Sequence, residues 1–238
     1  MLQQTQVARV IPAYARFLGR FPTLGSLARA PLADVLLEWS GLGYNRRARD
    51  LHRIARLSPG GLPRTVAALD ALPGIGSYTA SAVAGFAYRK RTAFADTNIR
   101  RVLGRSTVGR TATLSEALTL DARLQPPRAH AEWHHALMDI GALFCRSLKP
   151  RCGRCPLRAL CAYDGTEDRS SRRQTPFASS DRRIRGAIVR ALRGTTRGFG
   201  MVTLQRMIGD ERVVRLVHVL AREGLVEVSD KGVRLPAH

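Results

Sequence analysis

Acidic residues and long apolar runs are both scarce in this sequence of 238 residues. Only 18 Asp and Glu residues stand against 39 Lys and Arg, which leaves a net charge of +21 at pH 7. No run of about 18 apolar residues occurs, so a membrane span is not expected. The first residues lack the pattern of a signal peptide, so we expect an intracellular chain in a reducing compartment.

The excess of positive charge favours nucleic acid as a partner. Arg contributes most of the charge, and its planar guanidinium binds phosphate through two parallel hydrogen bonds. A GC-rich genome favours Arg codons and would explain Arg over Lys. It would not explain the shortage of acids.

Alternating apolar and polar residues, the pattern of a β-strand, are not convincing anywhere before residue 165. Helical spacing recurs instead, so the main body is predicted to be all-α. The predicted helices cover residues 2–18, Leu24–Ala30, Pro31–Trp39, Arg46–Leu57, Thr65–Leu72, Thr97–Thr107, Leu114–Leu124 and Ala129–Phe144.

The stretch from Leu72 to Asp96 predicts two helices joined by a tight hairpin. Pro73 breaks the first helix, and Gly74 and Gly76 have no Cβ, so their backbone can take positive φ and approach a ligand closely. The free N–H groups that begin the second helix would then suit a phosphate. A carboxylate, Asp96, follows the second helix.

Asp96 has two interpretations that are compatible. An Asp ahead of a helix caps backbone N–H groups, which is a structural role. A carboxylate held in that way also stabilises an oxocarbenium-like sugar and can orient an attacking water. The sequence therefore predicts a hairpin that holds a nucleic-acid backbone and a carboxylate that acts on the sugar.

All four cysteines lie within one short basic segment. Four thiols in seventeen residues of a reducing compartment indicate a metal site rather than disulfides. Their spacing suits a loop around an iron–sulfur cubane, and a tetrahedral zinc site is the alternative. The ligands would be Cys145, Cys152, Cys155 and Cys161.

The C-terminal part has a different composition. Residues 164–181 are rich in Ser, Arg, Asp and Thr, which predicts a linker. Helical patterns follow at Ile184–Leu192, Val202–Ile208 and Glu211–Glu223, and then a β-hairpin with its turn at residues 229–232. We expect a winged-helix-like module over 182–238, with a cap on the main body as the alternative.

These motifs together resemble the helix-hairpin-helix base-excision DNA glycosylases, and within them the MutY-type adenine glycosylases. The resemblance covers residues 1 to about 162. It implies a two-lobed helical domain over 1–163, with a [4Fe–4S] cluster loop at 145–161. The matching segments are Met1–Val7, Trp39–Tyr44, Leu72–Gly76, Asp96–Leu103 and Met138–Ala142.

The resemblance also implies roles for single residues. Asp96 and Tyr78 would be catalytic, and Gln4, Thr5, Tyr44, Gly74, Gly76 and Asn98 would contact DNA. Tyr44 would intercalate and Gln4 would wedge into the gap left by a flipped base, while Thr5 would contact the strand that carries 8-oxoguanine. Tyr44 could instead simply pack under its glycine turn.

Tyr78 separates two reaction types. Bifunctional relatives such as endonuclease III have a lysine here, which forms a Schiff base with the sugar. A phenol cannot, so the expected enzyme hydrolyses the N-glycosidic bond of adenine opposite 8-oxoguanine or guanine without cutting the strand. A tyrosine here also resembles thymine-mismatch glycosylases, which keeps thymine or uracil as an alternative substrate.

Two departures from the family pattern complicate this prediction. The family's catalytic glutamate lies two residues upstream of the position matched by Met1, so the chain as written is expected to be poorly active unless its start lies further upstream. A non-catalytic DNA-binding remnant is therefore the alternative to an enzyme. The winged-helix-like module also stands where relatives carry a Nudix-like domain. We expect a monomer that binds mismatched or oxidised duplex DNA in the bacterial cytoplasm, near the nucleoid.

Overall fold

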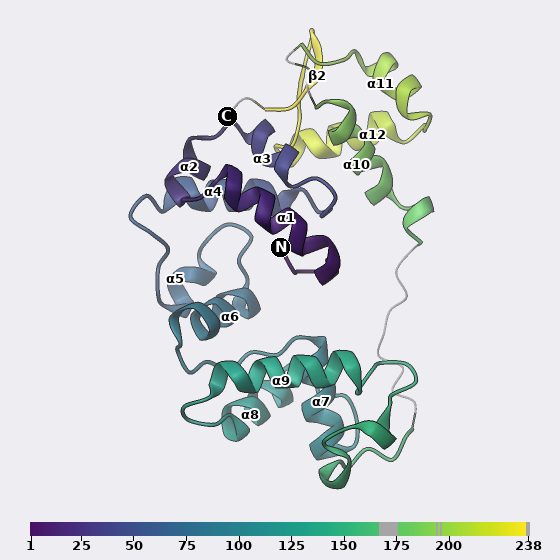
Figure 1. Cartoon of the computed structure of the whole chain (residues 1–238). Coiled ribbons are helices and arrows are strands. Elements are labelled where there is room, and N and C mark those ends of the chain that lie inside the picture. The colour runs from purple at the N-terminus through teal and green to yellow at the C-terminus, as the bar shows by residue number, and fades with distance from the viewer. Residues whose placement is uncertain (167–175, 194, 196, 237–238) are drawn as a thin grey trace. The chain divides into compact units, whose positions relative to one another are not determined.

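The computed structural model describes residues 1–166, 176–193, 195 and 197–236, and these are mostly helical (Figure 1). Two units emerge from the internal contacts. The first unit joins Met1–Leu62 to Gln174–His238, and the second covers Pro63–Arg173. Among the described residues, no helix has the length and apolar character needed to cross a membrane. The only strands described are the two of the C-terminal hairpin, which confirms the prediction of an all-α main body.

Four helices form the N-terminal part of the first unit: α1 (Val7–Arg20), α2 (Leu24–Arg29), α3 (Leu32–Glu38) and α4 (Arg46–Leu57). Thr23 begins α2 through a capping box with Ser26. The predicted start of the first helix at residue 2 is wrong. Helix α1 begins at Val7 because residues 2–5 form a turn, in which the Thr5 amide donates to the Leu2 carbonyl.

The C-terminal part of the first unit contains the three helices and the hairpin that the sequence predicted. These are α10 (Asp181–Ala191), α11 (Met201–Ile208), α12 (Val213–Arg222), β1 (Glu227–Ser229) and β2 (Gly232–Arg234). The strands are antiparallel, with Val228 opposite Val233. Residues 167–175 of the predicted linker lie outside the described residues. Phe177–Ser179 forms a 3₁₀ turn just before α10.

One hydrophobic core runs through both parts of the first unit. Leu36 and Trp39 of the N-terminal part belong to the same buried cluster as Ile184, Ile188 and Leu220 of the C-terminal part. The predicted division into a domain over 1–163, a linker over 164–181 and a module over 182–238 stays a prediction. The contacts themselves group the C-terminal helices with α1–α4.

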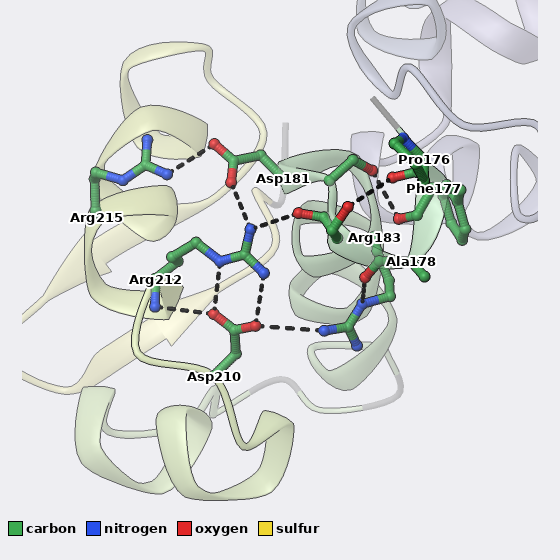
Figure 2. Close-up of polar contacts among 10 residues, drawn as sticks. Pro176, Phe177, Ala178, Asp181, Arg183, Asp210, Arg212 and Arg215 are labelled. Atoms are coloured by element: carbon green, nitrogen blue, oxygen red, sulfur yellow. Dashed lines mark hydrogen bonds and ion pairs between the residues drawn. The ribbon is translucent and has the colours of Figure 1, made fainter. Parts of the chain in front are cut away.

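An ion network joins the beginning of α10 to the turn between α11 and α12 (Figure 2). Arg212 forms two side-chain hydrogen bonds of 2.9 Å with Asp210 and reaches Asp181 at 3.2 Å. Arg215 donates to Asp181 at 2.7 Å, and Arg183 donates to Asp210 at 3.3 Å. Hydrogen bonds from Arg212 lower the pKa of Asp210 to about 2. The network therefore keeps its full charge at neutral pH.

The second unit consists of α5 (Val66–Asp70), α6 (Ser77–Tyr88), α7 (Thr97–Val108), α8 (Leu114–Leu124) and α9 (His130–Leu143), followed by the cysteine loop. Helices α7 and α9 pack very closely at Gly141. A Cβ atom there would lie 2.6 Å from the Cβ of Asn98, so only glycine allows this approach. The close crossing places the beginning of α7 beside the end of α9.

Candidate functional site

The hairpin between α5 and α6 has the predicted shape, with positive φ at one of its two glycines. Gly74 has φ of +73°, and the amide of Ile75 donates to the Leu72 carbonyl at 3.1 Å. Gly76 does not take positive φ; it is the extended N-cap of α6, with φ of −110°. No atom lies within 4 Å of where its Cβ would be. The missing side chain thus leaves the exposed first N–H groups of α6 open to a ligand.

Asp96 caps α7. Its Oδ1 accepts from the Ile99 amide at 2.8 Å, and its Oδ2 accepts from Asn98 Nδ2 at 3.1 Å. The carboxylate is half-buried and held at both oxygens, which fixes its direction. The capping role predicted for Asp96 is confirmed, and its catalytic role stays a prediction.

Tyr78, the second residue of α6, lies in the electrostatic field of Asp96. Burial, with the negative charge of Asp96 as the second cause, raises the pKa of Tyr78 to about 12. Its ring packs edge-on against Phe94, with 5.8 Å between centroids. The phenol of Tyr78 therefore stays protonated at neutral pH, and its catalytic role stays a prediction.

A buried polar network supports the segment that leads into Asp96. Asp121 Oδ2 accepts from the Phe94 amide at 3.1 Å and lies 2.8 Å from His134 Nε2, and both side chains are almost fully buried. The Trp133 indole donates to Asp121 Oδ1 at 2.7 Å. The ring of Phe94 stacks on that of His134 with 3.8 Å between centroids. These contacts hold the chain two residues before Asp96.

Arg101 connects the beginning of α7 to the cysteine loop, a role that sequence reasoning missed. Its guanidinium donates to Asn98 Oδ1 at 2.7 Å, to the Gly141 carbonyl at 2.9 Å and to the Cys145 carbonyl at 2.5 Å. Asn98 in turn donates to Asp96. The predicted contact of Asn98 with DNA stays a prediction. In this structure its amide links Arg101 to the carboxylate.

The four cysteines of the loop line one small pocket that is partly open to solvent, and none forms a disulfide. Within the described part of the chain, no three His, Cys, Asp or Glu side chains lie close enough together to hold one metal ion. The choice between an iron–sulfur cluster and a zinc ion at these thiols stays a prediction. The thiols that line the pocket belong to Cys145, Cys152, Cys155 and Cys161.

Arg105 is the buried cation of this loop and was also missed by sequence reasoning. Its Nη1 lies 3.8 Å from Cys145 Sγ and 2.9 Å from the Arg146 carbonyl, and its guanidinium lies 4.4 Å from the ring centre of Tyr163. Burial raises the pKa of the Cys145 thiol, and Arg105 opposes this rise. A positive charge at this point favours the thiolate form that metals require.

The first unit carries the other predicted DNA contacts, and Arg47 brings them together. Arg47 donates to Thr5 Oγ1 at 2.9 Å and to the carbonyls of Gln3 and Leu42 at 2.6 and 3.0 Å. It thereby ties the turn that contains Gln4 and Thr5 to the glycine turn that ends at Tyr44. A hydrogen-bonding Arg at the beginning of a basic helix gave no signal in the sequence.

Gln4 and Tyr44 both have strained backbones. Their φ values of +54° and +48° lie in the left-handed region, which is uncommon for residues other than glycine. Tyr44 is 40% exposed, and the Arg47 guanidinium lies 5.5 Å from its ring centre. Strain of this kind concentrates at binding sites. The alternative role for Tyr44, packing under its turn, agrees poorly with this exposure.

Comparisons with known proteins identify the family. Residues 1–122 match the model of the HhH-GPD superfamily base excision DNA repair protein. Adenine DNA glycosylase of Mycobacterium tuberculosis is 42% identical over 206 residues, which cover 81% of this chain and 67% of that protein. The human adenine DNA glycosylase is 39% identical over 171 residues, covering 68% of this chain and 31% of the relative.

Solved structures agree at the level of the fold. A thermostable thymine-DNA glycosylase has a TM-score of 0.59 and 28% identity, with coverage of 68% of this chain and 79% of that one. A trapped endonuclease III–DNA covalent intermediate has a TM-score of 0.60 and 25% identity, with coverage of 67% and 78%. The chain therefore belongs to the HhH-GPD superfamily of base excision DNA repair proteins.

Proposed function

We propose that this protein is a monofunctional adenine DNA glycosylase that removes adenine mispaired with 8-oxoguanine or guanine. The observation that carries the proposal is the Asp96 carboxylate, held at both oxygens beside a protonated Tyr78 on a helix-hairpin-helix unit. The adenine specificity rests on the adenine DNA glycosylases, which match at 39–42% identity, against 28% for the thymine-DNA glycosylase structure.

The proposed reaction uses Asp96 on the deoxyribose. As the bond between adenine and the sugar breaks, positive charge develops at the anomeric carbon, and the fixed carboxylate stabilises it. A water then adds to that carbon and loses a proton, while the departing adenine takes up a proton, which leaves an abasic site in an uncut strand. Tyr78 cannot form an imine with the opened sugar, so the strand stays intact.

DNA recognition is assigned to several parts of the chain. The exposed N–H groups at the beginning of α6, next to Gly74 and Gly76, would hold a backbone phosphate. Tyr44 would intercalate beside the lesion and Gln4 would fill the gap of the flipped base, with Thr5 against the 8-oxoguanine strand. We place this monomeric protein in the bacterial cytoplasm, near the nucleoid.

The cysteine loop would hold a [4Fe–4S] cluster through its four thiolates. When bound, the cluster cross-links a loop that carries many cations and so fixes their positions. Arg105 opposes the rise in the pKa of the Cys145 thiol that burial causes, and Arg101 holds the backbone of the same residue. Basic residues between the ligands would grip DNA phosphates. They are Arg146, Lys149, Arg151, Arg154 and Arg158.

A panel of mismatched duplexes tests the substrate. We expect release of adenine from duplexes with 8-oxoguanine:adenine, and strand breaks only after treatment with alkali. Faster release of thymine or uracil opposite guanine would favour the alternative substrate. Selective binding of the lesion duplex without release of any base would favour a non-catalytic binding protein.

The Tyr78→Lys variant tests the monofunctional assignment separately. A lysine at this position lies beside Asp96 and can attack the sugar, so borohydride should trap a covalent complex with DNA. The unmodified protein should give no trapped complex. Trapping by the unmodified protein would show that another amine performs this chemistry.

A further inference from the structure

We propose that Arg182 of the C-terminal part is a positioning residue that sets the orientation of the Tyr44 side chain for lesion recognition. This proposal rests on the DNA-contacting role of Tyr44 proposed above. The observation behind it is a hydrogen bond between residues 138 positions apart: Arg182 Nη1 donates to the Tyr44 hydroxyl at 3.1 Å.

Residues Ser40–Tyr44 form the glycine turn. Side chains at the two ends of α10 contact this turn or helix α3, which precedes it. Arg182 near the beginning of α10 reaches the hydroxyl of Tyr44. Just beyond its other end, Arg193 donates to Ser40 Oγ at 2.5 Å and to the Leu36 carbonyl at 3.2 Å. Helix α10 therefore supports the glycine turn through hydrogen bonds at both of its ends.

Helix α10 is held in place because its buried face belongs to the common core of the first unit. Ile184, Ile188 and Leu192 of α10 and its end are at most 1% exposed, and they share a cluster with Leu36 and Trp39. A third contact between the two parts of the first unit is the hydrogen bond that the Arg49 side chain donates to the Glu223 carbonyl. Arg182 is thus presented from a packed helix rather than from a loose tail.

The glycine turn needs such support. Glycines at positions 41 and 43 have φ of +84° and +69°, and Tyr44 itself is left-handed, so the backbone alone does not specify one position of the ring. Arg47 contacts the face of the ring, and Arg182 holds its hydroxyl. Two contacts at different points restrict both χ angles of the tyrosine. Less rotamer freedom then remains to be lost on intercalation.

The consequence is that the C-terminal part takes part in recognition. Its Arg182 holds the Tyr44 ring at the hydroxyl, and we expect it to act on lesion recognition through that ring. We expect this protein to lose lesion preference, and not merely general DNA affinity, when Arg182 is removed.

The test measures binding to two duplexes that differ in one base pair. One carries 8-oxoguanine opposite 2′-fluoro-deoxyadenosine, whose glycosidic bond resists hydrolysis, and the other is matched. The ratio of the two Kd values gives the lesion preference. Arg182→Ala should lower that ratio by about threefold to tenfold, which is the range of one ordinary net hydrogen bond. Arg182→Lys, which keeps a donor, should restore part of it.

Arg190→Ala is the matched control. Arg190 is exposed on the same helix, about 12 Å further along its axis at 1.5 Å per residue, and its removal costs the same charge. It should weaken both duplexes equally and leave the ratio unchanged. Equal melting temperatures for the variants exclude a general loss of structure.

A double-mutant cycle with Tyr44→Phe decides whether Arg182 acts through the hydroxyl. The double variant should lose no more preference than the more affected single variant. The fluorescence of a 2-aminopurine next to the lesion should also rise less with Arg182→Ala than with the unmodified protein. The reason is that the Tyr44 ring then unstacks the neighbouring base less often. Additive losses, or an unchanged ratio in Arg182→Ala, would overturn the proposal. If the unmodified protein shows no lesion preference, the proposed function fails as well.

Discussion

The Nε atom of Arg101 lies 2.5 Å from the carbonyl oxygen of Cys145, so the helix that Asp96 caps is bonded directly to the first residue of the cysteine loop. The same guanidinium holds Asn98, which holds Asp96. One buried side chain thus connects the carboxylate proposed for catalysis with the loop proposed to carry a cluster.

Replacing Arg101 with Ala should lower both the stability of the protein and the rate of adenine release. The change leaves four acceptors without their donor, including the Thr97 and Gly141 carbonyls, so we expect a loss of about 3 kcal/mol in the free energy of unfolding. Adenine release should slow at least about tenfold, because Asn98 no longer orients Asp96. Urea unfolding and single-turnover kinetics measure the two effects. The exposed Arg123→Ala is the control and should change neither.

Two substitutions at Asp96 should separate its two roles. Asn also caps helices, so Asp96→Asn should cost less than about 0.5 kcal/mol in stability, yet slow base release by about 10²–10³-fold. Asp96→Ala should slow the reaction similarly and also cost about 1 kcal/mol, because the cap is lost. Thermal unfolding and product release report the two quantities. A fully active Asp96→Asn protein would remove the carboxylate from the mechanism.

The raised pKa of Tyr78 predicts a dependence of stability on alkaline pH. The folded protein binds the phenol proton more tightly than the unfolded chain, whose tyrosine has a pKa of about 10. This contribution is present below pH 10 and is lost as the pH rises from 10 towards 12. The free energy of unfolding should therefore fall less steeply over that interval in Tyr78→Phe. Equal slopes for the two proteins would contradict the assignment.

The common core predicts that the C-terminal helices unfold together with α1–α4. Ile188→Ala should lower the free energy of unfolding by about 3 kcal/mol. Trp39 fluorescence, in a Trp133→Phe background, should report that loss although Trp39 lies on the N-terminal side. Val202→Ala, at a residue 69% exposed, is the control and should shift the transition little. A Trp39 transition that ignores Ile188→Ala would show that the two parts fold separately.

The cysteine loop predicts a brown protein that absorbs near 400 nm and contains iron and sulfide. Cys152→Ser should bleach that absorbance and lower the affinity for duplex DNA, because the basic loop is no longer fixed. A control at the exposed Leu160 (Leu160→Ala) should keep the colour. Zinc without iron in the purified protein would contradict the cluster.

Local features of this protein could be predicted from its sequence with good accuracy. The hairpin around Gly74, the cap at Asp96 and the C-terminal hairpin all depend on contacts within a few residues, which propensities and turn chemistry describe. Which of the two hairpin glycines takes positive φ could not be predicted, because a glycine permits positive φ without requiring it. The start of the first helix was misjudged because a distant residue, Arg47, holds the turn before it.

The sequence by itself determined the family, the four thiols and the carboxylate with its cap, since each is a matter of residue type and short spacing. Only the tertiary structure decided that Arg101 links the beginning of α7 to the cysteine loop. It also decided that α10 contacts the glycine turn, through a hydrogen bond between two residues 138 positions apart. An arginine that donates to backbone carbonyls leaves no pattern, because every residue offers the same acceptor. Which carbonyl it meets depends on how the buried apolar faces pack together.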